Sequence, residues 1–147
     1  MSDLCIKILE CCAADKGVLR IDRIGAGVGI ILFNSSLKKA AGLHTLAPHS
    51  ASEQPKNPVM YANTAIPYAL AELKKRGGSP PYSVAIAGGA ALLGAGNGAG
   101  TGLKVVEAVK AALTKAGLTI KLDQTGGSLL RSMILDIDRG KISITRV

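Results

Sequence analysis

The chain contains few aromatic side chains and no tryptophan. Phenylalanine, tyrosine and tryptophan together make up 3% of its 147 residues, whereas hydrophobic residues make up 48% and glycine occurs 18 times. The core must therefore be built mainly from aliphatic side chains and alanine, packed closely around glycines. Few rings are present to stack on bases, so the composition gives no support to nucleic-acid binding.

Cysteine is scarce, and its spacing fits neither a disulfide framework nor a metal site. Cys5, Cys11 and Cys12 form an odd set without a CxxC pair or a Cys/His pattern suited to zinc. We therefore expect no metal and no cofactor. In a reducing compartment thiols stay free, and we interpret Cys5 and Cys11 as residues that fill strand positions.

Long apolar runs are absent too. A membrane-spanning helix needs around 20 apolar residues, and the N-terminal sequence MSDLCIKILE has Asp3 and Glu10 around a short apolar stretch, unlike a signal peptide. We therefore expect a cytoplasmic protein without membrane insertion. A length of 147 residues suits one hydrophobic core, so we also expect a single domain over residues 1–147.

Acidic residues are outnumbered by basic ones. The chain has 18 Lys and Arg against 10 Asp and Glu, which gives a formal net charge of +8. This surplus favours anionic partners through long-range attraction that salt weakens. The only tight basic run is Lys74–Arg76, at the predicted end of a helix, where cations also complement the helix dipole. We interpret the surplus as a solvated surface.

The hydrophobic pattern predicts many strands and two helices. Short apolar runs are bounded by glycine, proline, asparagine and serine, and two longer segments have apolar residues at helical spacing. The predicted strands are residues 4–9, 18–24, 28–33, 40–47, 83–87, 119–123, 131–137 and 141–146, and the predicted helices are residues 61–76 and 103–116. Because the strands are grouped and do not alternate strictly with helices, the fold class is α+β, with a mixed β-sheet or sandwich core flanked by two main helices.

A glycine-rich stretch precedes the second predicted helix. Such a loop can bind phosphate through its backbone amides, but residues 88–102 contain neither GxGxxG nor GxxxxGK[ST]. We therefore expect a flexible surface loop there.

Several short blocks occur in a fixed order from near residue 6 to the C-terminus. They are GVL at 17–19 with IGAGVG at 24–29, GLHTLAP at 42–48, YANTA at 61–65, AGGA at 87–90, and TGG at 125–127 with RS at 131–132. This ordered set resembles the CheD family of chemoreceptor glutamine deamidases over nearly the whole chain. The resemblance implies a CheD-like, cysteine-hydrolase-like fold.

The family's reaction uses a cysteine, a histidine and a threonine. A thiolate attacks the amide carbon, the imidazole activates the thiol and protonates the departing ammonia, and a third group orients the ring. The resemblance places His44 at the histidine position, but Gly27 stands at the cysteine position and Ile21 at the threonine position. Glycine has no side chain and isoleucine accepts no hydrogen bond, so two of the three roles are vacant.

The resemblance also suggests binding residues. Gly88, Gly89, Thr125 and Arg131 fall in the matching blocks, and we take them as candidates for contact with a bound partner.

Three functions remain open from the sequence. The first is a non-catalytic CheD-like protein that binds a chemoreceptor helix or a CheC-type phosphatase through a degenerate deamidase site. The alternative is an active protein-glutamine deamidase with an unrecognised nucleophile, for which Cys11, Cys12 and Thr45 are candidates, although Thr45 should point away from His44 on a regular strand. The third is a structural or oligomeric module without a role in chemotaxis. The sequence does not indicate an oligomeric state.

Overall fold

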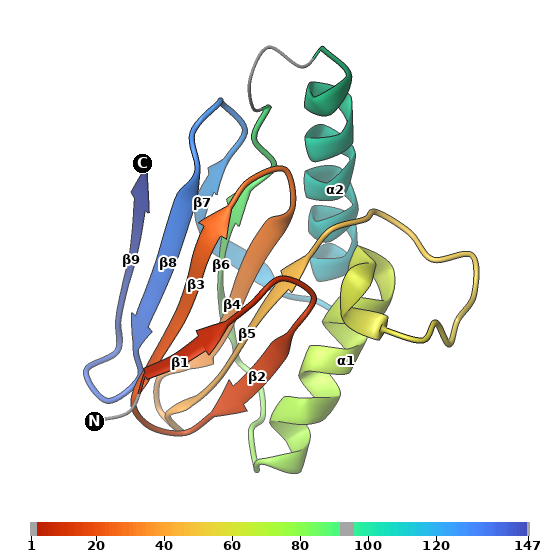
Figure 1. Cartoon of the computed structure of the whole chain (residues 1–147). Helices are drawn as coiled ribbons and strands as arrows, with labels where there is room; N and C mark the ends of the chain where they lie inside the picture. Colours follow the sequence, from red (N-terminus) through yellow and green to blue (C-terminus); the bar gives the residue numbers. More distant parts are fainter. Residues whose placement is uncertain (1–2, 92–95, 147) are drawn as a thin grey trace.

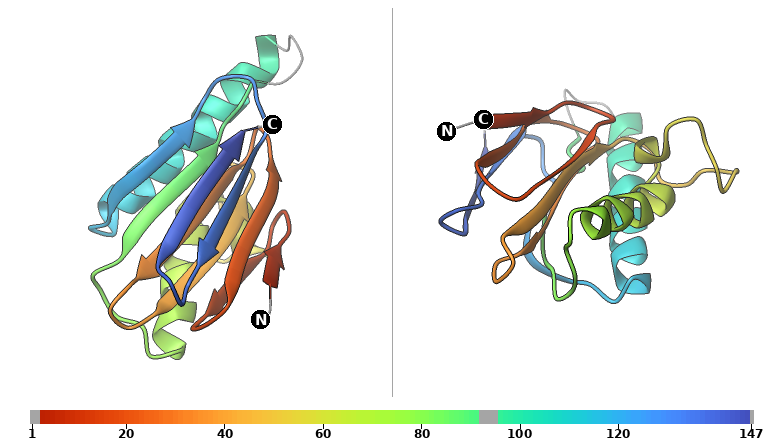
Figure 2. Two further views of the ribbon diagram at one scale, coloured as in Figure 1. Left: turned by 90° about the vertical axis from the view of Figure 1, so that its left-hand side faces the viewer. Right: turned by 90° about the horizontal axis from the view of Figure 1, so that it is seen from below.

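Two β-sheets pack face to face, and two helices cover the outer face of one of them (Figures 1 and 2). The computed structural model describes residues 3–91 and 96–146. The four-stranded sheet has the order β1 (Asp3–Ile6), β3 (Val18–Ile24), β8 (Arg131–Asp136), β9 (Lys141–Arg146). The five-stranded sheet has the order β2 (Cys11–Ala14), β5 (Lys39–Thr45), β4 (Val28–Asn34), β6 (Ser83–Gly88), β7 (Thr119–Thr125). The helices are α1 (Ala62–Lys75), α2 (Gly96–Lys115) and the short 3-10 turn η1 (Pro58–Met60).

The predicted α+β class is confirmed, and both sheets are mixed. β1 pairs parallel with β3 and β6 pairs parallel with β7, whereas the other strand pairs are antiparallel. The N-terminal prediction was wrong in one respect. The expected strand at 4–9 ends at Ile6, and a turn in which Leu9 has a φ of 66° leads into β2, which was not among the predicted strand ranges. Cys5 and Cys11 do fill strand positions, in β1 and β2.

The glycine-rich stretch is shorter as a loop than the sequence predicted. Residues 92–95 of this stretch lie outside the described residues, but α2 already begins at Gly96, seven residues before the predicted start. The missing side chain of Gly102 has a packing reason, because a Cβ there would lie 2.8 Å from the carbonyl oxygen of Gly89. The absence of a side chain at Gly102 therefore lets α2 approach Gly89, just after β6, and this tertiary contact outweighs the low helix propensity of glycine at this position.

The core has two layers that share β4. All seven residues of β4 are buried, with Ile30 and Leu32 in the layer against the helices and Ile31 and Phe33 in the layer between the sheets. Because successive side chains of a strand point to opposite faces, a strand covered on both faces reads as one continuous apolar run. This explains the uninterrupted run at 28–33.

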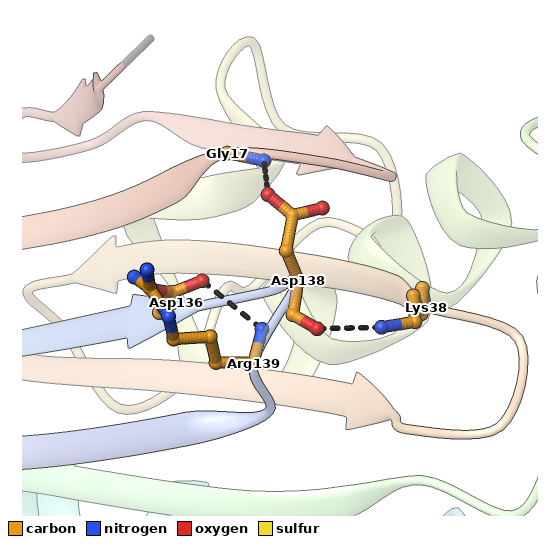
Figure 3. Close-up of polar contacts among 5 residues, drawn as sticks. All are labelled: Gly17, Lys38, Asp136, Asp138 and Arg139. Carbon is orange, nitrogen blue, oxygen red and sulfur yellow. Dashed lines mark hydrogen bonds and ion pairs between the residues drawn. The ribbon is translucent and has the colours of Figure 1, made fainter. Parts of the chain in front are cut away.

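Three turns are joined at one end of the sandwich (Figure 3). The carboxylate of Asp138 accepts a hydrogen bond from the backbone N–H of Gly17 at 3.2 Å, and its carbonyl oxygen accepts one from the Lys38 ammonium. Arg139 donates to the carboxylate of Asp136 within the same hairpin. These contacts link the β2–β3, β4–β5 and β8–β9 turns, so the two sheets are held in register at this end.

We expect Gly88→Ala to be strongly destabilising. Gly88 has a φ of +121°, and a Cβ there would overlap the carbonyl oxygen of Gly27, which is backbone and cannot turn away. The free energy of unfolding should fall by at least about 3 kcal/mol. Gly117→Ala is the matched control, because its φ is +75° with no atom within 4 Å, and it should cost only about 1 kcal/mol. Urea unfolding of both variants measures the difference, and equal losses would contradict the steric explanation.

Candidate functional site

His44 is a buried residue near the end of β5. Only 3% of its surface is exposed, and it alternates along the strand with Leu43, so its ring projects into the layer between the sheets. The β1–β2 turn fixes its backbone. The carbonyl oxygen of His44 accepts a hydrogen bond from Leu9 at 2.8 Å, and its N–H donates to the carbonyl oxygen of Glu10 at 3.2 Å.

The His44 ring lacks the partner that a catalytic imidazole needs. Its Nδ1 is buried and has no hydrogen-bond partner among the described residues. Burial lowers the pKa of His44 to about 4, so the ring is neutral at pH 7. A base of such a low pKa removes a proton from a thiol poorly, because general-base catalysis works best near the operating pH.

The structure brings Gly27 and His44 together. A Cβ at position 27 would lie 3.3 Å from Nε2 of His44, so a side chain there would face the imidazole. The same Cβ would lie 2.6 Å from the carbonyl oxygen of Thr45 and 2.9 Å from Cδ2 of Leu46. The chain after β5 therefore lies directly against the backbone of Gly27 and leaves no room for a side chain.

Ile21 is the other residue that the sequence placed at this site. It is fully buried and belongs to the cluster between the sheets, where its Cδ1 would lie 3.6 Å from a Cβ at Gly42. Gly42 faces the same layer as His44, two residues earlier on β5. An aliphatic side chain thus fills the inter-sheet layer on the histidine's face of β5 and offers no hydrogen bond to the ring.

Backbone hydrogen bonds connect the segment that contains Gly27 to two other glycine-rich segments. Gly89 donates to the carbonyl oxygen of Gly27 at 2.8 Å, and Ala90 donates to that of Gly25 at 3.0 Å. Gly126 in turn donates to the carbonyl oxygen of Gly88 at 2.9 Å. The blocks that the sequence analysis singled out at 24–29, 87–90 and 125–127 therefore meet in space.

The buried side chain of Arg131 binds the same glycine-rich segments. It is only 6% exposed, and its Nη1 donates to the carbonyl oxygens of Gly88 and Gly126. Burial, with a smaller contribution from the charge of Arg146, lowers the pKa of its guanidinium. The hydroxyl of Thr125 instead donates to Asp123 at 2.7 Å. The role of the four predicted binding residues, Gly88, Gly89, Thr125 and Arg131, stays a prediction. Gly88, Gly89 and Arg131 form hydrogen bonds that connect backbone segments.

The thiols are not placed as nucleophiles. Cys11 lies opposite Leu43 and packs against the layer below the helices, and Cys12 lies opposite Gly42 and packs against the layer between the sheets. Burial raises the pKa of Cys11 to about 12 and also raises that of Cys12, so both carry little thiolate at pH 7. The hydroxyl of Thr45 donates to the carbonyl oxygen of Met60 at 3.0 Å.

His44 and Gly27 lie outside the best-formed surface cavities of the described residues, and these residues offer no metal centre. Four such cavities have volumes of about 380 to 760 Å³, and neither His44 nor Gly27 lines any of these four. Within residues 3–91 and 96–146, no three His, Cys, Asp or Glu side chains are grouped so that they could hold a metal ion. A helix long and apolar enough to cross a membrane is likewise not found in these two segments.

Comparisons with known proteins point to one family. The family described as CheD chemotactic sensory transduction matches residues 46–146. A probable chemoreceptor glutamine deamidase CheD of Methanococcus vannielii is 38% identical over 126 residues, which cover 84% of this chain and 81% of that protein. The chemoreceptor glutamine deamidase CheD of Thermotoga maritima is 33% identical over 134 residues, which cover 90% of this chain and 84% of that protein.

The burial of His44 predicts a pH dependence of stability. The pKa of the folded state is about 4, below the ordinary value of 6.5, so the neutral ring favours folding above pH 6.5 and this contribution is lost as the pH falls toward 4. From about pH 7.5 to about pH 5 the free energy of unfolding should fall by about 2 kcal/mol. Urea unfolding of His44→Leu should lack this loss, whereas the matched control His49→Leu should keep it. A wild-type stability that does not change over this range would contradict the buried neutral ring.

Proposed function

This chain belongs to the CheD family, and we propose that it is a non-catalytic member that acts in chemotaxis by binding a protein partner. The partner is a chemoreceptor helix or a CheC-type phosphatase, and the contact is made at the degenerate deamidase site. One observation carries the proposal: the position that faces Nε2 of His44 is Gly27, which has no side chain.

The chemistry of amide hydrolysis explains why this glycine matters. Deamidation of glutamine requires a nucleophilic atom beside the imidazole, which attacks the amide carbon and later releases ammonia. Gly27 supplies no such atom. The unpartnered Nδ1 of His44 supports the same conclusion, because Ile21 cannot orient the ring or stabilise an imidazolium.

The alternative of an active deamidase with another nucleophile gains no support from the neighbouring residues. Cys11 faces the helices, and both it and Cys12 have raised pKa values, opposite to the change that activates a catalytic cysteine. Thr45 is engaged with Met60. A water molecule activated by His44 would need a base, and the low pKa of this buried imidazole makes it a weak one at pH 7.

The surface next to Gly27 and His44 is suited to binding a protein partner. Its partly exposed residues are small or apolar: Gly25, Ala26, Leu46 and Ala47. A helix can approach small residues closely and bury apolar surface against them. In this way the protein binds the kind of partner that active members of the family deamidate, but it does not deamidate that partner.

We expect binding without ammonia release. Isothermal titration calorimetry with a glutamine-bearing chemoreceptor fragment and with a CheC-type phosphatase should detect binding of one of them, while an ammonia assay of the receptor mixture stays at background. Ala26→Glu should weaken this binding at least about tenfold, because it buries a charge in an apolar contact. The matched control is Ala116→Glu, at an exposed position after α2. Ammonia release that His44→Ala abolishes would overturn the non-catalytic assignment, and the absence of binding to both proteins would overturn the binding assignment.

Restoring the family's side chains should not restore the reaction. The variant Gly27→Cys with Ile21→Thr supplies a thiol and a hydroxyl, but its Cβ at position 27 would lie 2.6 Å from the carbonyl oxygen of Thr45. We expect the free energy of unfolding to fall by about 1 to 3 kcal/mol and ammonia release to remain at background. Gly27→Ala is the matched control, because it introduces the same Cβ without a nucleophile. A double variant that is as stable as the wild type and releases ammonia would show that the site is open enough for catalysis.

A further inference from the structure

One side of the sandwich is left open. The turn between β1 and β2 joins the two sheets at one side, whereas β9 and β7 are the last strands of their sheets at the other. β8 lies against β6, so their outer neighbours β9 and β7 lie on the same side (Figure 2). In the described part of the chain no strand pairs with the outer edge of β9, so its backbone N–H and C=O groups there are free to pair.

The inter-sheet core is incompletely covered along this open side. Ile142 and Ile144 on β9 and Leu122 on β7 are only partly buried, although all three pack against the cluster between the sheets. An added strand beside β9 would place its inward side chains over Ile142 and Ile144 and remove this apolar surface from water.

The two ends of β9 carry positive charge. Lys141 begins the strand and Arg146 ends it, both are exposed, and neither forms an ion pair within the described residues. Asp136 lies opposite Lys141 in the ladder but pairs with Arg139 at 2.9 Å. At the other end Arg146 lies opposite Arg131, so two like charges adjoin without an acidic neighbour in the ladder.

We propose that the free edge of β9 is a docking surface for an extended acidic segment of another protein, which adds to the sheet as an antiparallel strand. The register of β9 determines the pattern of the segment. Ile142, Ile144 and Arg146 point inward and Lys141 points outward, because β-strand side chains alternate. Read from its N-terminus, the segment therefore carries an acidic residue opposite Arg146, apolar residues opposite Ile144 and Ile142, and an acidic residue opposite Lys141. Its pattern is acidic-x-apolar-x-apolar-acidic.

Charge argues against a second copy of this chain as the occupant. Antiparallel pairing of two β9 strands brings the lysine end of one beside the arginine end of the other. The whole chain also carries a net charge of +8, which adds repulsion between copies. An acidic segment instead meets opposite charges at both ends, and main-chain pairing at a sheet edge supplies the remaining affinity.

The test uses a fluorescein-labelled peptide, Glu-Thr-Val-Thr-Val-Glu with Gly-Ser flanks, in a fluorescence anisotropy titration of the full chain. Saturable binding is expected, and Lys141→Glu with Arg146→Glu should weaken it at least about tenfold through the loss and reversal of both charge contacts. Both residues are exposed, so the variant should fold normally. Lys104→Glu with Lys115→Glu, at two exposed positions of α2, changes the net charge by the same amount and is the matched control, which should bind like the wild type.

Two further peptides separate strand addition from charge attraction. A peptide with lysine in place of both glutamates should bind the double variant and not the wild type. A peptide with N-methyl groups on the backbone amides that face β9 should lose binding, because it cannot form the ladder. Equal binding of the N-methylated peptide, or an unchanged affinity of the double variant, would overturn the proposal. Dimerisation of the free chain that the peptide reverses, measured by analytical ultracentrifugation, would identify a second copy as the occupant instead.

The peptide-binding test at β9 is independent of the test for partner binding at the His44 site. Ala26 follows β3, which β8 separates from β9 in the sheet, so Ala26→Glu does not touch the outer edge of β9 and should leave peptide binding unchanged. A loss of peptide binding in this variant would show that the two surfaces are one, and would contradict a separate docking edge.

Discussion

The structure depends on the close approach of glycine backbones around Gly27. The carbonyl oxygen of Thr45 would lie 2.6 Å from a Cβ at this residue, and the carbonyl oxygen of Gly27 leaves no room for a Cβ at Gly88. Side chains at either position would force β4, β6 and the chain after β5 apart. The absence of side chains is therefore a packing requirement here, and the end of β5 with Leu46 occupies the place that a side chain at position 27 would take.

The packing around Gly27 also determines the surroundings of the His44 ring. In a thiol hydrolase the imidazole has a nucleophile on one side and an orienting group on the other. Here it faces a glycine, its Nδ1 has no hydrogen-bond partner among residues 3–91 and 96–146, and burial lowers its pKa to about 4. The residue is best understood as a core histidine in a scaffold whose other family features remain.

The two surfaces considered for partners differ in physical character. The surface over His44 is made of small and apolar residues, whereas the β9 edge combines free backbone groups, partly exposed isoleucines and cations at both ends. The first suits a helix, and the second suits an extended acidic segment. Arg131 connects the two regions, since it donates to the carbonyl oxygen of Gly88 and lies opposite Arg146 in the ladder.

Local patterns in the sequence were enough for most elements and for the family. Strands such as β3 and β9 and the core face of α1 follow from side-chain periodicity, which depends only on near neighbours along the chain. The resemblance carried by the ordered blocks also assigned Gly27 to the family's cysteine position and His44 to its histidine position. Only the tertiary structure decided how β2 pairs, that α2 begins within the glycine-rich stretch, and that Thr45 and Leu46 pack against Gly27. Each of these depends on contacts between segments far apart in the chain, such as Gly102 with Gly89 or Cys12 with Gly42, and no local pattern encodes such distances.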